Sequence, residues 1–429
     1  MKYISLFVLL IFIMSCNSNN ISDTTTQKGT LNLSINKTNI PNDVSKLKIY
    51  LTRDGFENIE EEAEITDSTT NYLEIQISAV VIGTWKLIVE AVDANETIIF
   101  NGEKNIEVTA NEVSPIHITL TPTDNGTGDL FIYIDWFNYD KWFDHPTNPI
   151  ITKHNNSEDQ YGIWEPTVIY DDGKFKMWYF GLAANAYGSI FYAHSDDGIN
   201  WTKYSNQPVI SEGNSGDWDG RRVQPGAVIK IGAEYFLYYS GFNDPDGKWG
   251  IGLARSDDGI YWTKYSQPII EGGDIWDYHI MPASIIELND KYYLYYSGNM
   301  FLGDDYRIGL AVSNDGIIWE KYDYPIFNAS MEWENNSVRD ASVLNEDGNL
   351  IMLYTNGQAP DAFGFAYSTD GINWIKRTDK PFFDYTDSIN DYVTIAHPYF
   401  IKYQNEYRIY YTGFYADDDA ELCLARLLP

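Results

Sequence analysis

A seven-residue phrase of the form Ser-x-Asp-Gly-Ile-x-Trp occurs four times in this chain of 429 residues. The copies end at Trp201, Trp262, Trp319 and Trp374, so they recur every 55 to 61 residues. Self-similarity at a period of this size is typical of one supersecondary unit that stacks on copies of itself. The repeat therefore constrains the architecture of most of the chain and limits where a functional site can lie.

The residues around the first copy predict a unit of four β-strands. Alternating apolar and aromatic residues place these strands at 165–170, 174–180, 189–194 and 199–204. Asp-Asp-Gly and Asp-Gly sequences separate consecutive strands, as expected of hairpin turns. Four strands in each repeat predict the blade of a β-propeller.

The inner strand of the unit recurs five times, once more than the turn. Its starts lie 57 to 59 residues apart, at Glu165, Gln224, Met281, Asp340 and His397. The fifth unit lacks an outer strand, while the Pro and two apolar residues that end each outer strand also occur before the first unit, at Pro149–Ile151. We therefore expect residues 142–151 to supply the missing strand and to close a five-bladed propeller, which leaves no exposed sheet edge.

The beginning of the chain has the features of an export signal. A Lys at position 2 precedes an apolar run at residues 4–14, which is too short to span a bilayer. Residues 13–16 resemble a bacterial lipobox, and by that resemblance Cys16 becomes the lipidated first residue of the mature chain. We expect a signal peptide at 1–16, a flexible tether at 17–28 and a lipid anchor in the bacterial cell envelope, at the outer membrane or cell surface.

Residues 29–122 carry no copy of the repeat and show about seven alternating strands, which is typical of an immunoglobulin-like β-sandwich. We expect this domain to act as a spacer, with carbohydrate binding as the alternative. A linker at 123–129 and the propeller at 130–429 complete an all-β chain.

Composition excludes some partners. The chain has 62 acidic and 29 basic residues and a net charge of −33, which disfavours binding to nucleic acid. Cys423 is the only cysteine besides Cys16, so the processed chain has no intramolecular disulfide and no cysteine cluster for zinc. We expect a monomer that requires no cofactor. Calcium at the propeller axis is an option, and loops 243–246 and 417–419 have suitable residues but fit ordinary solvated loops better.

Polar side chains stand where the inner strands begin. In a propeller these starts converge at one mouth of the axis, whereas blade cores need apolar residues. The residues at or next to the starts are Trp164, Glu165, Arg222, Gln224, His279, Met281, Arg339, Asp340 and His397. We therefore expect the functional site at this mouth.

Two carboxyl groups that face one pocket suit the cleavage of a glycosidic bond, in which one donates a proton and the other activates water or attacks carbon. We assign Glu165 as base or nucleophile and Asp340 as acid. Arg222 and Arg339 would hold substrate hydroxyls or set carboxyl pKa values, with Trp164, Gln224 and His279 as further substrate contacts. His397 would bind a metal or act as an acid. The structural alternatives are an Arg339–Asp340 ion pair, a capping role for Glu165 and hydrogen-bonded histidines.

Residues Glu165–Tyr179 and the run that begins at Gly250 resemble the five-bladed propeller glycosidases, the superfamily that includes glycoside hydrolase families 32, 43, 62, 68, 117 and 130. The resemblance covers about residues 130–429. It implies that Glu165 replaces the family 43 base, an Asp. It also implies that Met281 stands in place of a pKa-tuning Asp, and that Arg339 and Asp340 lie near the place of the acid. The chain is therefore similar to a divergent branch.

Three functions remain open from the sequence. The main hypothesis is a glycoside hydrolase that acts on oligosaccharides or polysaccharide side chains. The second is a glycan-binding surface lipoprotein without catalysis. The third is a phosphorylase of the family 130 type, in which Arg222, Arg339 and His279 would bind phosphate. The repeats also resemble sialidase Asp-boxes but are one residue shorter, and the acidic chain argues against that family.

Overall fold

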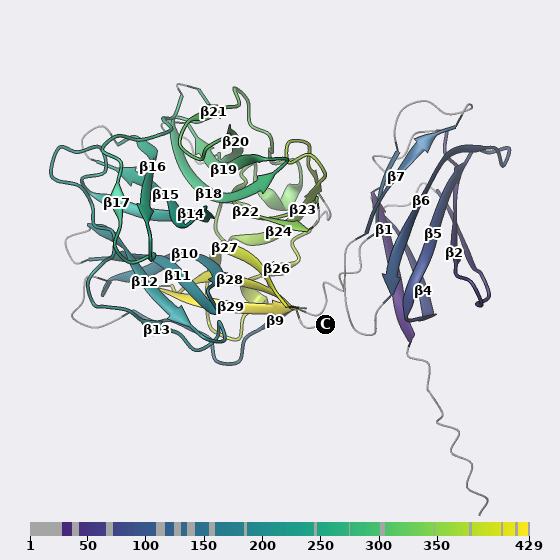
Figure 1. Cartoon of the computed structure of the whole chain (residues 1–429), viewed down its shortest axis with the longest axis horizontal. Coiled ribbons are helices and arrows are strands. Elements are labelled where there is room, and N and C mark those ends of the chain that lie inside the picture. The colour runs from purple at the N-terminus through teal and green to yellow at the C-terminus, as the bar shows by residue number, and fades with distance from the viewer. Residues whose placement is uncertain are drawn as a thin grey trace, which may run out of the picture.

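The computed structural model describes residues 28–36, 43–65, 72–108, 116–123, 130–134, 142–153, 159–183, 187–243, 247–273, 275–300, 305–346, 348–376, 380–404, 406–416 and 419–427. The chain is all-β over these ranges, with only short 3₁₀ turns such as Glu332–Glu334 and Tyr385–Asp387 between strands (Figure 1). The part that the structure describes contains no helix with the length and apolar character needed to cross a bilayer. Cys16 and residues 17–27 of the expected tether lie outside the described residues.

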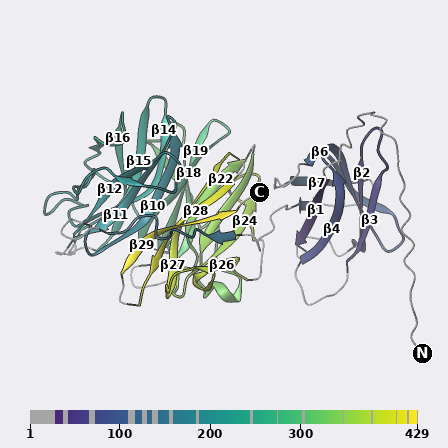
Figure 2. The same cartoon turned by 90° about the horizontal axis from the view of Figure 1, so that it is seen from below.

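The N-terminal part contains two antiparallel sheets. β1 pairs with β4, and a second sheet has the order β3-β2-β5-β6-β7-β8 (Figure 2). Alternate residues of β2 and β5 are buried, including Leu47 and Val89, which gives each strand one core face and one solvated face. The strands are β1 (Lys28–Asn36), β2 (Lys46–Thr52), β3 (Ile59–Glu64), β4 (Tyr72–Val81), β5 (Gly83–Val92), β6 (Ile98–Val108), β7 (Ile116–Pro122) and β8 (Leu130–Ile134).

The pairing of β8 shows that the expected start of the repeat-bearing part at residue 130 is wrong. β8 pairs along its length with β7, from Leu130 opposite Leu120 to Ile134 opposite Ile116. The sequence analysis placed residue 130 at the start of the repeat-bearing part. The alternating residues of β8 instead extend the N-terminal sheet, because β7 offers them an open edge.

The repeat-bearing part consists of antiparallel four-stranded units. Figure 1 shows their first strands near a common centre, and each first strand contacts the next in a closed ring of β10, β14, β18, β22 and β27. The first two units are β10 (Gly162–Asp171), β11 (Lys174–Leu182), β12 (Gly188–Ser195), β13 (Thr202–Lys203), β14 (Arg222–Ile231), β15 (Glu234–Phe242), β16 (Trp249–Ser256) and β17 (Thr263–Lys264). The next two are β18 (His279–Leu288), β19 (Lys291–Asn299), β20 (Arg307–Ser313), β21 (Trp319–Lys321), β22 (Arg339–Glu346), β23 (Asn349–Thr355), β24 (Ala362–Ser368) and β25 (Ile375–Lys376), with β26 (Phe383–Asp384) also on β24.

The last unit is completed by a strand from before the first. β27 (Thr394–Tyr403), β28 (Glu406–Phe414) and β29 (Ala420–Leu427) form its first three strands, and β9 (Trp142–Asp144) pairs with β29. Ile151 forms a further bridge to Leu422. Residues 142–151 therefore supply the outer strand, as the recurring Pro-apolar-apolar phrase predicted.

The repeated phrase forms the same turn in every copy. In the first copy, Asp197 Oδ1 accepts hydrogen bonds from the amides of Ile199 and Asn200 at 2.8 Å each, and the Ser195 hydroxyl accepts from the Gly198 amide at 2.8 Å. The glycine has a φ of 72° in this copy, a left-handed conformation that glycine adopts without steric cost.

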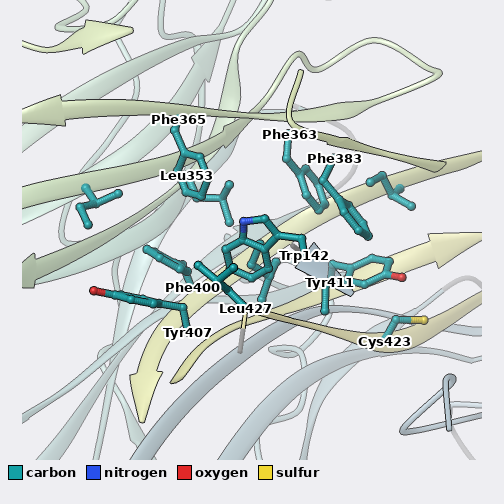
Figure 3. Packing of buried hydrophobic residues seen from close by; sticks show 14 of the residues in the cluster. Trp142, Leu353, Phe363, Phe365, Phe383, Phe400, Tyr407, Tyr411, Cys423 and Leu427 are labelled. Atoms are coloured by element: carbon teal, nitrogen blue, oxygen red, sulfur yellow. The ribbon is translucent and has the colours of Figure 1, made fainter. Parts of the chain in front are cut away.

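Each turn also locks its unit to the preceding one. The glycine carbonyl accepts a hydrogen bond from an aromatic side chain in the second strand of that unit. The donors are Tyr410 to Gly198 at 2.9 Å, Trp178 to Gly259 at 2.9 Å, Tyr238 to Gly316 at 2.7 Å and Tyr295 to Gly371 at 3.0 Å. In the second strand of the fourth unit, Leu353 stands at the position of these donors. The next unit, the fifth, has no copy of the repeated turn that could accept such a hydrogen bond. Trp142 of the closing strand packs in the same cluster as Leu353 (Figure 3).

A buried ion pair recurs at the same place in four units. A lysine two residues after the repeat tryptophan donates to a buried acidic side chain that precedes an inner strand. The pairs are Lys203–Asp159 at 2.6 Å, Lys264–Asp219 at 2.7 Å, Lys321–Asp277 at 2.6 Å and Lys376–Glu334 at 2.6 Å. These pairs fix the loops that lead into the inner strands, and thereby the strand starts at the mouth.

Candidate active site

Three of the five inner-strand starts have an unusual backbone conformation. Glu165, Asp340 and His397 have φ values of 57°, 55° and 50°, in the left-handed region that residues with a Cβ rarely adopt. Each lies at a β-bulge, where the register shifts between flanking pairs. Gln224 and Met281 are not among the described residues with positive φ, although their strands also shift register nearby. Bulges re-aim side chains beside active sites, and local strain of this kind costs about 1–3 kcal/mol.

The same three residues line one cavity of about 50 Å³ at the ring centre, together with Arg339 and Met281. A volume of this size holds a few water molecules rather than a sugar, so the cavity is the floor of the mouth. The structure therefore brings together Glu165, Asp340, Arg339 and His397 of the predicted residues.

Glu165 and His397 face each other in this cavity, with Nε2 of His397 at 3.5 Å from Oε1 of Glu165. Burial raises the pKa of Glu165 well above its ordinary value of 4.5, and the negative charge of Asp340 raises it further. Burial lowers the pKa of His397 to about 4. Glu165 therefore keeps its proton to a higher pH than an ordinary glutamate does, whereas the His397 imidazole is neutral at pH 7 and is unsuited to the acid role expected of it.

Arg339 lies between two carboxylates. Its Nη2 is 2.8 Å from Oδ2 of Asp361, and its Nε is 3.6 Å from Oδ2 of Asp340. Asp361 is buried, with a side-chain exposure of 4%, and its Oδ1 has no hydrogen-bond partner among the described residues. Arg339 and Asp340 therefore form the expected ion pair. Asp361 extends it to a row of three charged side chains, of which Arg339 and Asp340 line the cavity.

Hydroxyl groups on neighbouring strands hold the two carboxyl residues. The Asp340 amide donates to Ser297 Oγ at 2.9 Å, and Thr355 Oγ1 donates to Asp340 Oδ2 at 3.3 Å. The Glu165 amide donates to Thr412 Oγ1 at 3.2 Å. These bonds satisfy backbone groups that the bulges remove from the strand ladders. The sequence analysis missed all three hydroxyl residues and Asp361, although Ser or Thr does recur near the end of each second strand except β11.

The other predicted site residues do not line the cavity. Trp164 packs on Phe180, with ring centroids 4.5 Å apart, and Gln224 is buried. His279 Nδ1 accepts from the Trp249 amide at 3.3 Å. Arg222 is close enough that its charge lowers the pKa of Glu165.

The described ranges contain no group of three or more His, Cys, Asp or Glu side chains that could hold a metal ion. Residues 417 and 418 of one predicted calcium loop and 244–246 of the other lie outside those ranges. Cys423 is fully buried, and burial raises the pKa of its thiol, as expected of an inert core cysteine.

Asp361 is predicted to position Arg339 for Asp340. Asp361→Asn keeps the shape but removes the charge that holds the guanidinium. A hydrogen bond between charged groups contributes about 1.5–3 kcal/mol, so kcat should fall about tenfold to a hundredfold with little change in KM. Steady-state kinetics would measure this, with Asp290→Asn in an exposed turn as the control. An unchanged kcat would remove Asp361 from the site.

Comparison with protein families gives a match to the glycosyl hydrolases family 32 N-terminal domain over residues 219–390. Over 178 residues the chain is 28% identical to the β-1,2-mannobiose phosphorylase of Thermoanaerobacter sp. (strain X514), covering 37% of this chain and 55% of that protein. The chain thus spans about half the length of this curated relative.

Solved structures agree on the fold. A candidate glycosidase of Bacteroides thetaiotaomicron superposes with a TM-score of 0.56 at 19% identity, over 68% of this chain and 97% of that one. A structure from work on glycoside hydrolase family 130, which describes hydrolases that target β-1,2 mannosidic linkages in Candida mannan, gives a TM-score of 0.50 at 19% identity, over 66% and 95%.

The repeat-bearing part therefore has a propeller fold of the glycoside hydrolase and phosphorylase type. Together with the sequence matches, this supports a divergent branch of the propeller glycoside hydrolase superfamily. The predicted resemblance to the propeller glycosidases is therefore confirmed for the superfamily.

Proposed function

We propose that this protein cleaves glycosidic bonds in oligosaccharides or polysaccharide side chains, at the mouth of a five-bladed propeller preceded by an immunoglobulin-like sandwich. The observation that carries the proposal is the meeting of Glu165 and Asp340 at one cavity on strained, bulged strand starts. Packing alone requires neither the carboxyl groups nor the strain. The ring of inner strands and the two N-terminal sheets support the architecture.

The electrostatics favour Glu165 as the proton donor, which reverses the roles assigned from the sequence. A carboxyl group with a raised pKa keeps its proton to a higher pH than usual and can give that proton to the leaving oxygen. Asp340, paired with Arg339, is then the side chain that activates a nucleophile.

The nucleophile is water in hydrolysis and phosphate in phosphorolysis. Phosphorolysis is favoured by two cations near the cavity, Arg339 and Arg222, and by the similarity to a β-1,2-mannobiose phosphorylase. Phosphate carries its own negative charge and needs no carboxylate base, so Asp340 would be less important in that reaction. We propose β-1,2-linked mannosides as the first substrates to test.

Product analysis tests the proposal. The full-length protein is incubated with β-1,2-mannobiose and a panel of neutral polysaccharides, with and without inorganic phosphate. We expect new reducing ends without phosphate, or mannose 1-phosphate that forms only with phosphate. Binding without any product would instead identify a glycan-binding surface protein and would overturn the enzymatic assignment.

We also propose that Cys16 anchors the protein as a monomer in the bacterial envelope. The lipobox-like residues 13–16 support this location. In bacterial cells that express the chain, Cys16→Ala should move it from the membrane fraction to the soluble fraction. Unchanged membrane association would contradict a lipid anchor at this residue.

A further inference from the structure

The cavity at the ring centre has a polar side and an apolar side. The first, fourth and fifth units contribute Glu165, Asp340 and His397. The second and third units contribute mainly residues without polar side chains, namely Pro225, Gly226, Met281, Pro282 and Ala283. Among the described lining residues of these two units, Ser240 of β15 is the one with a polar side chain. Its hydroxyl group therefore needs a partner that these neighbours do not supply.

Equivalent hydroxyl groups in two other units have a backbone partner. Ser240, Ser297 and Thr412 occupy the same position near the ends of their second strands, each followed by a glycine. Ser297 Oγ accepts a hydrogen bond from the Asp340 amide at 2.9 Å, and Thr412 Oγ1 accepts from the Glu165 amide at 3.2 Å. Both hydroxyl groups thus bind the amide at the axial position of the next unit around the ring.

The seam between the second and third units lacks the amide for this bond. In the fourth unit, Asp340 directly follows the register partner of Thr355. At the same place in the third unit, Pro282 follows the register partner of Ser297, and proline has no backbone N–H. Ser240 is 3% exposed, and its side chain forms no hydrogen bond with any residue that the structure describes. This buried hydroxyl group therefore opens into the cavity and is available to a ligand or to water.

The backbone around Ser240 is closely packed, which fixes its place. Ser240 pairs in register with Gln224 on one side and Ile251 on the other. Gly226 lies so close to the third unit that a Cβ there would be 2.0 Å from the Pro282 carbonyl oxygen. A group held in this way binds a ligand without first being ordered, which favours affinity.

We propose that Ser240 binds one hydroxyl group of the sugar that is cleaved at the mouth, and thereby selects sugars that carry this hydroxyl. A serine can donate to and accept from a sugar hydroxyl, while the apolar residues beside it suit C–H groups and disfavour a charged group. The cavity of about 50 Å³ admits a hydroxyl or hydroxymethyl group rather than a whole ring. The inference rests on the proposed function for its ligand class.

Isothermal titration calorimetry with β-1,2-mannobiose tests this role, with Glu165→Gln as the background so that the disaccharide is not consumed. Adding Ser240→Ala should raise Kd about fivefold, as expected for one lost hydrogen bond between neutral groups. Among analogues that each lack one hydroxyl group, one should bind the background protein about fivefold more weakly and should bind both proteins equally. Urea unfolding should give the same midpoint for both proteins, because Ser240→Ala removes no hydrogen bond within the described residues.

The matched control is Ser284→Ala, which should leave Kd unchanged. Ser284 is also 3% exposed, but its hydroxyl already accepts from the Val343 amide at 3.0 Å. An equal rise in Kd for both serine variants would overturn the inference, as would an unchanged Kd in Ser240→Ala, which would leave this hydroxyl with a bound water only.

Absence of binding by the background protein would also overturn the role of Ser240. The proposed function is decided separately, by turnover in the unmodified protein. Binding that depends on Ser240 without any product would contradict the proposed function alone. Product from another glycan of the panel, without binding of β-1,2-mannobiose, would support the proposed function and contradict the role of Ser240.

Discussion

Replacing Glu165 by Gln should lower kcat by a factor of about 10²–10⁴, because an amide cannot donate the proton that the leaving oxygen needs. The change keeps the side-chain size and the hydrogen bond of the Glu165 amide to Thr412. KM should change little. The measurement is steady-state kinetics on the substrate that product analysis identifies, with Glu287→Gln, on the exposed outer end of β18, as the control.

The pH dependence of the same protein gives a second readout. The proton donor is active below its pKa, and burial raises the pKa of Glu165 well above 4.5. The rate of the unmodified enzyme should therefore persist above the ordinary range of a glutamate and fall as pH rises through the raised pKa. Glu165→Gln should lose this alkaline limb. Full activity in Glu165→Gln would remove Glu165 from catalysis.

Replacing Lys376 by Met should lower the free energy of unfolding by about 3–5 kcal/mol, because it leaves a buried charge without its partner. Glu334 has a side-chain exposure of 0%, and Lys376 Nζ lies 2.6 Å from both of its carboxylate oxygens. Lys376 also donates to the Asn328 carbonyl at 2.7 Å, so its loss opens the seam between the third and fourth units. Urea unfolding followed by tryptophan fluorescence would measure the shift.

The control for this change is Lys174→Met. Lys174 pairs with Asp196 at 3.1 Å, but the side chains are 51% and 85% exposed, so the pair contributes at most about 1 kcal/mol. The double change Glu334→Gln with Lys376→Met should recover part of the loss, since no buried charge remains. Equal effects of Lys174→Met and Lys376→Met would show that the buried pair has no special role.

The repeat made the propeller part of the fold predictable. Ser195, Asp197, Gly198 and Trp201 each have a bonding role within the turn, so the phrase marks the same hairpin wherever it occurs. Counting inner-strand starts beyond the turns then predicted the closing strand. The end of the N-terminal part was misplaced because an alternating strand such as β8 can join either neighbour, and only the open edge of β7 decides.

The site was predictable in position but not in chemistry. Equivalent starts converge in any propeller, so Glu165 and Asp340 could be brought together from spacing alone. The raised pKa of Glu165 comes from burial, which the sequence does not encode locally. Asp361 was missed because it lies in the connection between β23 and β24, outside every repeated position, and reaches the cavity only through Arg339.

The most direct test of the axial site is a crystal structure of Glu165→Gln soaked with β-1,2-mannobiose. We predict the disaccharide above the cavity floor at the ring centre, with its glycosidic oxygen within hydrogen-bonding reach of the side chain at position 165 and its anomeric carbon facing Asp340. A disaccharide bound elsewhere on the protein with this mouth empty, or bound here with its glycosidic bond away from both side chains, would contradict the assignment.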